Sequence, residues 1–168
     1  DAVLAQNRFS VRPEDSRMQS GRALWLRGNG HGGFTAEASG ESGLAIDGDQ
    51  RGAATADFDE DGRPDLVVAQ NAGATRLYHN VAGKAGLRVQ LRGPAGNPDA
   101  IGAVLRPVRH GQLGPAQAIT AGGGYGSQAA TVMIVPGDSE AVEVRWPGGK
   151  VSRTAAPGGT TMLTVTHP

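Results

Sequence analysis

The amino-acid sequence predicts an all-β protein, in which a propeller-blade-like antiparallel repeat unit is followed by a small β-sandwich. Three observations support this. The 168 residues include 27 glycines and 10 prolines, which suits many short strands joined by tight turns. Leu87–Arg92 alternates apolar and polar residues with period two, the pattern of a half-buried strand. Asp1–Asn7 (DAVLAQN) nearly repeats as Asp65–Asn71 (DLVVAQN), and internal repetition built from strands is typical of propeller blades.

Composition excludes several classes of function. The formal net charge of +0 and pI near 7.1 argue against nucleic acid as a partner. No apolar run approaches the roughly 18 residues of a membrane helix. The absence of cysteine rules out disulfides and thiolate metal sites.

Charge is divided unevenly along the chain. Residues 1–80 carry 12 acidic residues and 8 arginines, a net −4, and residues 81–168 carry 4 acidic and 8 basic residues, a net +4. This is either a chance division between two folded units or a basis for head-to-tail association of copies.

The first predicted domain, residues 1–83, contains five strand signals and one inserted loop. A glycine-rich segment, Gly28-x-Gly30-x-x-Gly33, matches the dinucleotide fingerprint by letter, but it opens a hairpin and not a helix, so we interpret it as a turn. The segment Phe9–Gly21 reads as the inserted loop. The expected strands are Ala23–Arg27, Phe34–Ala38, Gly52–Ala56, Leu66–Gln70 and Thr75–His79.

The second predicted domain, residues 84–168, reads as a compact β-sandwich or barrel of about six strands without an amphipathic helix, and we take the sandwich. Trp25 and Trp146 are expected as core anchors of the two domains, with sugar stacking as the alternative role for one of them. Tyr125, in a glycine-rich bend, either packs locally or is exposed for binding. The expected strands are Leu87–Arg92, Ile101–Val108, Gln117–Thr120, Thr131–Val135, Val142–Trp146 and Met162–Thr166.

The most informative segment is Asp57–Asp65, which we name the cation loop. It places aspartates at loop positions one, three, five and nine, and glycine at six, the spacing with which a short loop wraps oxygen ligands around calcium. Two unit charges ~4 Å apart interact by roughly 4 kcal/mol at an effective dielectric near 20, so a folded loop with four aspartates favours a cation. Oxygen ligands favour calcium over zinc or copper. The candidate side-chain ligands are Asp57, Asp59, Asp61 and Asp65.

Other residues in and near the cation loop limit which kind of calcium site it can be. Position twelve is Val68, where an EF-hand needs a glutamate, and a strand follows the loop. Glu60 is expected to point to solvent. Asp47 and Asp49 are read as a turn in preference to ligands. The alternative to a cation site is an acidic, solvated turn.

These segments together resemble a known pairing of domains. Residues Ala53–Asn71 resemble an FG-GAP or VCBS-type repeat, and the part from Leu87 onward resembles the ASPIC/UnbV domain, which follows such repeats in secreted proteins of the cartilage-acidic-protein type. The ASPIC/UnbV-like motifs are Asn97–Ala103 (NPDAIGA), Gly124–Gln128 (GYGSQ) and Val142–Lys150 (VEVRWPGGK). The resemblance implies an extracellular protein with bound calcium and no established catalytic activity. It also implies that the Arg63 carbonyl joins the four aspartates as a ligand. A propeller needs several blades, whereas this chain has about one.

The sequence therefore predicts an exported, calcium-binding structural or adhesion module, which is not an enzyme. Its partners are expected to be proteins or further copies of the chain, joined through open strand edges into a fibre or array. The alternative is a polysaccharide-binding accessory domain or a fragment of an extracellular enzyme. Because Asp1 matches Asp65, it is expected to be the last carboxylate of a loop whose earlier part is missing, as in a piece of a longer repeat protein.

Overall fold

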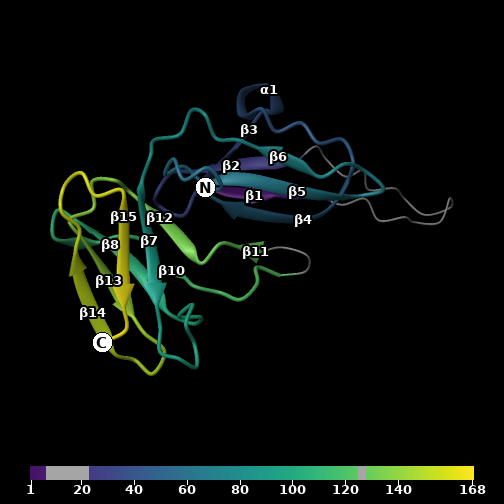
Figure 1. The fold of residues 1–168 in the computed structure, drawn as a ribbon. Coiled ribbons are helices and arrows are strands. Elements are labelled where there is room, and N and C mark those ends of the chain that lie inside the picture. The colour runs from purple at the N-terminus through teal and green to yellow at the C-terminus, as the bar shows by residue number, and fades with distance from the viewer. Residues whose placement is uncertain (7–22, 125–127) are drawn as a thin grey trace. The chain divides into compact units, whose positions relative to one another are not determined.

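The computed structural model describes residues 1–6, 23–124 and 128–168, and it confirms the predicted all-β class. The described residues form several small sheets and no closed barrel (Figure 1). They divide into two compact units. The first unit comprises residues 1–6, 23–54, 66–78 and Gly124, and the second comprises residues 55–65, 79–123 and 128–168. The predicted boundary after residue 83 stays a prediction.

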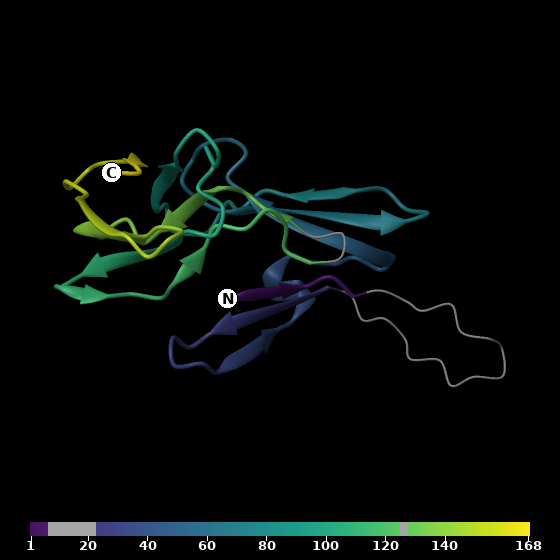
Figure 2. The same cartoon turned by 90° about the horizontal axis from the view of Figure 1, so that it is seen from below.

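The first unit is built from short antiparallel strands. Strands β1, β2 and β3 lie in that order in one sheet, side by side in Figure 2. Strands β4, β5 and β6 follow one another in a second sheet, in which β5 and β6 are antiparallel. The elements are β1 (Ala2–Leu4), β2 (Leu24–Gly28), β3 (Phe34–Glu37), α1 (Ser39–Ser42), β4 (Asp49–Ala56), β5 (Asp65–Asn71) and β6 (Arg76–Tyr78). The last two residues of β4 and the first of β5 belong to the second unit.

A small hydrophobic core holds the first unit together. Its buried members are Ala23, Leu44, Ile46, Leu66 and Val68. Gln50 is also buried, and both ends of its side-chain amide form a hydrogen bond. Its side chain accepts from the Gln6 amide and donates to the Ile46 carbonyl, at 3.1 Å each. A buried amide paired in this way avoids the desolvation penalty of an unsatisfied polar group.

The aspartates that open the two repeated segments make the same kind of contact. Asp1 precedes β1, and its Oδ1 accepts a hydrogen bond of 2.8 Å from the Gly28 amide. Asp65 begins β5, and its Oδ1 accepts one of 2.8 Å from the Asn80 amide. The residue after each aspartate pairs with a residue of the neighbouring strand: Ala2 pairs with Leu26, and Leu66 pairs with Tyr78. In both copies the donor amide lies two residues beyond that partner. The aspartate at this position therefore fastens its strand to the next one along the chain.

The second unit is a β-sandwich of two sheets. One sheet has the order β10-β8-β13-β14, with β9 also paired to β8, and the other has the order β12-β7-β15, in which β15 runs parallel to β7. Within this unit the Ala130 amide, after β11, donates to the Thr55 carbonyl at 3.0 Å. The strands are β7 (Leu87–Arg92), β8 (Val104–Arg109), β9 (Gln112–Leu113), β10 (Gln117–Ala118), β11 (Gln128–Ala129), β12 (Val132–Val135), β13 (Ala141–Arg145), β14 (Val151–Ala155) and β15 (Met162–Thr166).

The sandwich core follows the alternation of the strands. Leu87, Val89 and Leu91 of β7 are buried and face side chains from the other sheet, such as Leu105 and Val144. Trp146 is 1% exposed, and its indole N–H donates to the Ser152 hydroxyl at 2.8 Å, so the predicted core role of Trp146 is confirmed. Burial of such side chains supplies the main driving force for folding the sandwich.

The other predicted anchor, Trp25, is half-buried against the first unit's core, and Arg27 lies over its ring at 5.5 Å. The predicted turn between β2 and β3 is confirmed. Gly30 and Gly32 have φ of 77° and 84°, in the left-handed region that favours glycine.

The strand predictions for the second unit need correction in three respects. The strand expected from Ile101 begins at Val104, because the Asn97 side chain bonds both backbone groups of Ile101 at 2.9 Å and holds a turn there. Strand β14, an exposed edge strand with little apolar patterning, was not predicted. The described part of this region holds nine strands where about six were expected.

The other sequence predictions of secondary structure compare with the structure as follows. Leu87–Arg92 and Met162–Thr166 are strands with the predicted bounds. The single-turn helix Ser39–Ser42 was not expected. The predicted loop Phe9–Gly21 lies outside the described residues, as does Tyr125.

Candidate metal centre

The cation loop connects β4 to β5 and is organised by hydrogen bonds to its own first aspartate. Asp57 accepts from the backbone amides of Asp61 and Gly62, at 3.0 Å each. Asp61 in turn accepts from the Arg63 amide at 2.8 Å. These bonds curl the chain around the Asp57 carboxylate. The turn needs left-handed backbone at Glu60 and Gly62, whose φ values are 64° and 84°.

Asp65 closes the other end of the loop. Its side chain is buried at 2% exposure, and it accepts from the amides of Phe58 at 3.2 Å and Asn80 at 2.8 Å. Two backbone donors hold the buried carboxylate in one orientation. Asp65 thus fixes the start of the loop and the segment after β6 to the first residue of β5.

The structure brings all four predicted aspartates into two overlapping groups. Carboxylate oxygens of Asp57, Asp59 and Asp65 lie within 4.8 Å of one another. Asp59 and Asp61 form the second group with His79, at the same separation. Each group offers three ligand atoms that could hold a metal ion. Asp57 and Asp65 are buried deeply, whereas the Asp59 and Asp61 side chains are 31% and 21% exposed and open the site to solvent.

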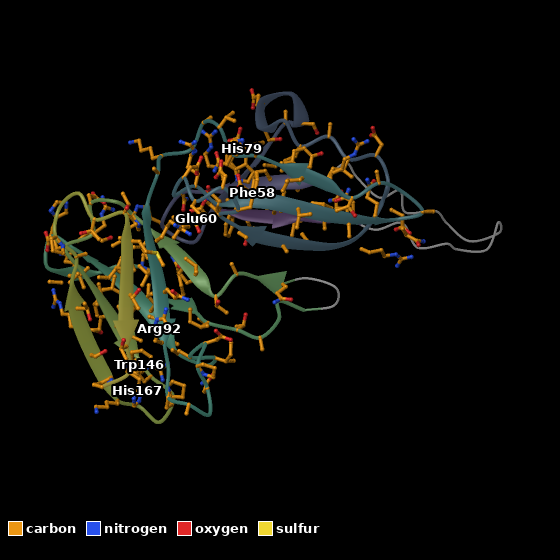
Figure 3. All side chains as sticks on the ribbon, in the orientation of Figure 1. Phe58, Glu60, His79, Arg92, Trp146 and His167 are labelled. Carbon is orange, nitrogen blue, oxygen red and sulfur yellow. The ribbon has the colours of Figure 1, made fainter. Side chains whose placement is uncertain are left out.

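His79 belongs to this site, and sequence reasoning missed it. Its Nε2 lies 2.8 Å from Asp59 Oδ2 and 3.5 Å from Asp61 Oδ2. The Phe58 ring meets the imidazole edge-on, with centroids 5.7 Å apart (Figure 3). His79 follows β6, fourteen residues after the loop ends, so no ligand spacing in the sequence connects it to the aspartates. The pairing of β6 with β5 brings it there.

Two arginines complete the surroundings of the loop. Arg63 Nε donates to the Asn80 carbonyl at 2.7 Å, and its Nη2 bonds Asp61. Arg88, from β7, places Nε 3.1 Å from Asp57 Oδ2 and Nη2 3.1 Å from Glu60 Oε1. The buried Arg88 Nε has no partner of hydrogen-bond geometry, so its contact with Asp57 is one of charge and not a directed bond.

These contacts change the acidity of three groups. The hydrogen bond and charge of Arg88 hold the pKa of Glu60 below its usual value. The same hydrogen bond to Glu60 raises the pKa of Arg88, with burial opposing it and the charges of Glu60 and Asp57 adding to it. Partial burial opposes ionisation of Asp61, but the Arg63 amide, the Arg63 charge and His79 together lower the Asp61 pKa.

The remaining sequence predictions stand as follows. The Glu60 side chain is 71% exposed, which agrees with the expectation that it points to solvent, although it also meets Arg88. Asp49 begins β4 and pairs with Arg51 at 3.0 Å. The Arg63 carbonyl as a ligand stays a prediction.

The donor chemistry fits a hard cation. Asp57, Asp59 and Asp65 offer only oxygen atoms, the ligand type that calcium takes. The backbone amides leave further lone pairs free on these carboxylates, since each carboxylate has about four acceptor positions. The aspartates of the loop, with backbone carbonyls and water, would therefore hold such an ion.

Fold and site together define a class: an all-β protein in which a strand repeat with an acidic, metal-capable loop precedes a β-sandwich. Comparison with protein families shows which known domains these two parts of the chain match. Residues 9–68 match the FG-GAP-like repeat, and residues 93–168 match the family described as ASPIC and UnbV. The chain thus carries an FG-GAP-like repeat followed by an ASPIC/UnbV domain, as the sequence resemblance predicts.

Both domains are typical of extracellular proteins, and FG-GAP repeats suggest interactions with other proteins. No curated protein matches the chain. In the described ranges, no helix has the length and apolar character needed to cross a membrane.

Proposed function

We propose that this chain is an exported, calcium-stabilised structural or adhesion module without catalytic activity. The observation that carries the proposal is the convergence of Asp57, Asp59 and Asp65 within 4.8 Å, in a loop of an FG-GAP-like repeat. FG-GAP repeats often bind calcium, and the oxygen-only donor set agrees with that ion. Calcium would balance the negative charge of these three carboxylates, two of which, Asp57 and Asp65, are deeply buried.

A structural role for the ion follows from where the ligands lie. Asp57 organises the loop, and Asp65 fastens it to β5 and to the Asn80 amide. An ion bound to both carboxylates would therefore brace the connection between the β4 and β5 ends of the loop. These aspartates are engaged by backbone donors, an arrangement that suits bracing better than proton transfer. Extracellular calcium modules bind with dissociation constants of about 10⁻⁴–10⁻³ M, and we expect that range here.

The test is calcium titration of the purified chain by calorimetry, together with thermal unfolding in calcium and in chelator. We expect saturable heat and a higher melting temperature in calcium, since an ion that binds only the folded state stabilises it. Asp59→Asn should raise the calcium Kd by about tenfold or more, because it removes one of the ligand charges. The matched control is Asp99→Asn, an exposed aspartate outside the acidic groups, which should leave the Kd unchanged. Absence of heat in the wild-type chain, with a melting temperature that chelator does not alter, would refute the proposal.

The proposed partners are proteins or further copies of this chain. Strands β3 and β14 end their sheets, and most of their side chains are exposed. Such strands present unpaired backbone groups to which another strand can add. These edges support assembly into a fibre or array through strand addition.

A further inference from the structure

We infer that Arg88 is a built-in counter-cation of the cation loop, which joins the loop to the sandwich and opposes a bound calcium ion electrostatically at Asp57. The inference rests on the proposed calcium binding and goes beyond it. Neither family match includes Arg88, because the matches cover residues 9–68 and 93–168.

The geometry puts a cation beside the most deeply placed ligand. The Asp57 side chain is 3% exposed and that of Arg88 is 15% exposed, with 3.1 Å between Asp57 Oδ2 and Arg88 Nε. A buried carboxylate without a compensating charge is strongly unfavourable. In the absence of a metal ion, Arg88 supplies that compensation.

The backbone holds this pair together. The Gly86 amide donates to the Gly62 carbonyl at 2.8 Å, and a Cβ placed on Gly62 would lie 2.9 Å from the Gly86 carbonyl oxygen. The loop therefore packs directly against the residue that precedes β7. The Arg88 amide donates to Thr161 at 3.0 Å, and β7 lies between β12 and β15. Arg88 thus lies on the central strand of one sandwich sheet.

Glu60 gives the guanidinium a second partner. Its Oε1 lies 3.1 Å from Arg88 Nη2, on a residue whose φ of 64° belongs to the left-handed region. A calcium ion at Asp57 would compete with Arg88 for the same carboxylate, while Glu60 continues to balance the arginine. The ion and the arginine then oppose each other: each contributes less to the stability of the folded chain when the other is present.

This reasoning fixes the sign of an energetic coupling. Removing the Arg88 charge should destabilise the calcium-free chain more than the calcium-saturated chain. The same removal should tighten calcium binding to the folded protein. A residue that merely positions the ligands would have the reverse effect on affinity, because its loss would weaken binding.

The experiment compares Arg88→Met with Arg92→Met, the matched control at the other end of β7, where the side chain is exposed (Figure 3). Both are made in a Trp25→Phe background, so that Trp146, the remaining tryptophan, reports unfolding of the second unit. Melting temperatures are measured in chelator and in saturating calcium. Calorimetry below the transition gives the calcium Kd.

We expect Arg88→Met to lower the melting temperature more in chelator than in calcium, and to lower the Kd by roughly 2- to 5-fold. Arg92→Met should change neither quantity. An equal loss of melting temperature in both conditions, or a raised Kd, would overturn the inference. If Arg88→Met does not fold in chelator, folding in calcium still supports the inference. If it folds in neither condition, Arg88→Gln, which also removes the charge but keeps an N–H donor for Glu60, decides by the same comparison of melting temperatures. Absence of calcium heat in the parent protein would instead refute the proposed function itself.

Discussion

At the residue scale, Gly86 packs closely against strand β12 of the sandwich. Gly86 lies where a Cβ would come within 2.4 Å of the Val135 carbonyl oxygen and 2.6 Å of an Ile134 methyl carbon. These distances are well below van der Waals contact, and one of the atoms is backbone, which cannot move without disturbing β12. Position 86 therefore admits no side chain.

We predict that Gly86→Ala destabilises the chain by about 1–3 kcal/mol, the usual range for overpacking a well-packed site. Urea unfolding followed by fluorescence measures the change. Gly96→Ala is the control, since a Cβ there has no neighbour within 4 Å. The packing described for Gly86 would be wrong if the two variants unfolded at the same urea concentration.

The candidate site shows what spacing can and cannot reveal at this scale. Asp57, Asp59, Asp61 and Asp65 could be selected from the sequence because loop ligands follow a local pattern. His79 and Arg88 could not, because strand pairing and β7 bring them to the loop from outside it. Spacing encodes local geometry only, whereas these contacts depend on the tertiary fold.

At the scale of elements, the end of β8 is joined to the segment before β13 by charge. Arg109 bonds Asp138, and the two Glu140 carboxylate oxygens accept the amides of His110 and Gly111 at 2.9 and 3.2 Å. His110 and Gly111 have φ of 50° and 72°, which the turn between β8 and β9 requires. Acidic side chains from one segment thereby cap the turn of another.

The Asp138 pair gives a pH-dependent prediction. The Arg109 hydrogen bond lowers the pKa of Asp138 below its ordinary value. A carboxyl whose pKa is depressed by folding stabilises the chain above its unfolded pKa, and this contribution is lost as pH falls through the folded value. Carboxyl NMR titration should show the pKa of Asp138 rising in Arg109→Gln. The control variant Glu143→Gln, on β13, should leave the pKa of Asp138 unchanged. If the Asp138 pKa did not move in Arg109→Gln, the pairing would be contradicted.

Strand prediction succeeded where alternation was strong and failed where side-chain hydrogen bonds or exposure intervened. Leu87–Arg92 could be predicted because its apolar residues face the core at every second position. The strand at Val104 starts late because Asn97 holds the preceding turn, which hydropathy does not report. Strand β14 has no apolar face to detect, because its sequence, VSRTA, holds one large apolar residue, Val151, and that residue is exposed.

At the scale of the whole molecule, open edges and uneven charge bear on association. Strand β14 ends its sheet with Val151 at 55% exposure. The two halves of the sequence carry net charges of −4 and +4, which would attract one copy to another. Both features favour contacts between chains.

We predict that the apparent mass by static light scattering rises above 17.1 kDa with concentration in the presence of calcium. Val151→Lys should reduce this rise, because a charged residue on an edge strand opposes strand addition. Val81→Lys makes the same change at an exposed valine outside any strand and should have no effect. A wild-type chain that stays at the monomer mass at every concentration would end the assembly hypothesis.

The placement of β7 has a practical consequence for anyone dissecting this protein. The ASPIC and UnbV match begins at residue 93, but β7 ends at Arg92 and supplies Leu87, Val89 and Leu91 to the sandwich core. An expression clone trimmed to the family limits would lack the strand that bridges β12 and β15, and it would expose their inner faces. Such a clone should precipitate, whereas the folded sandwich requires a start upstream of Gly86.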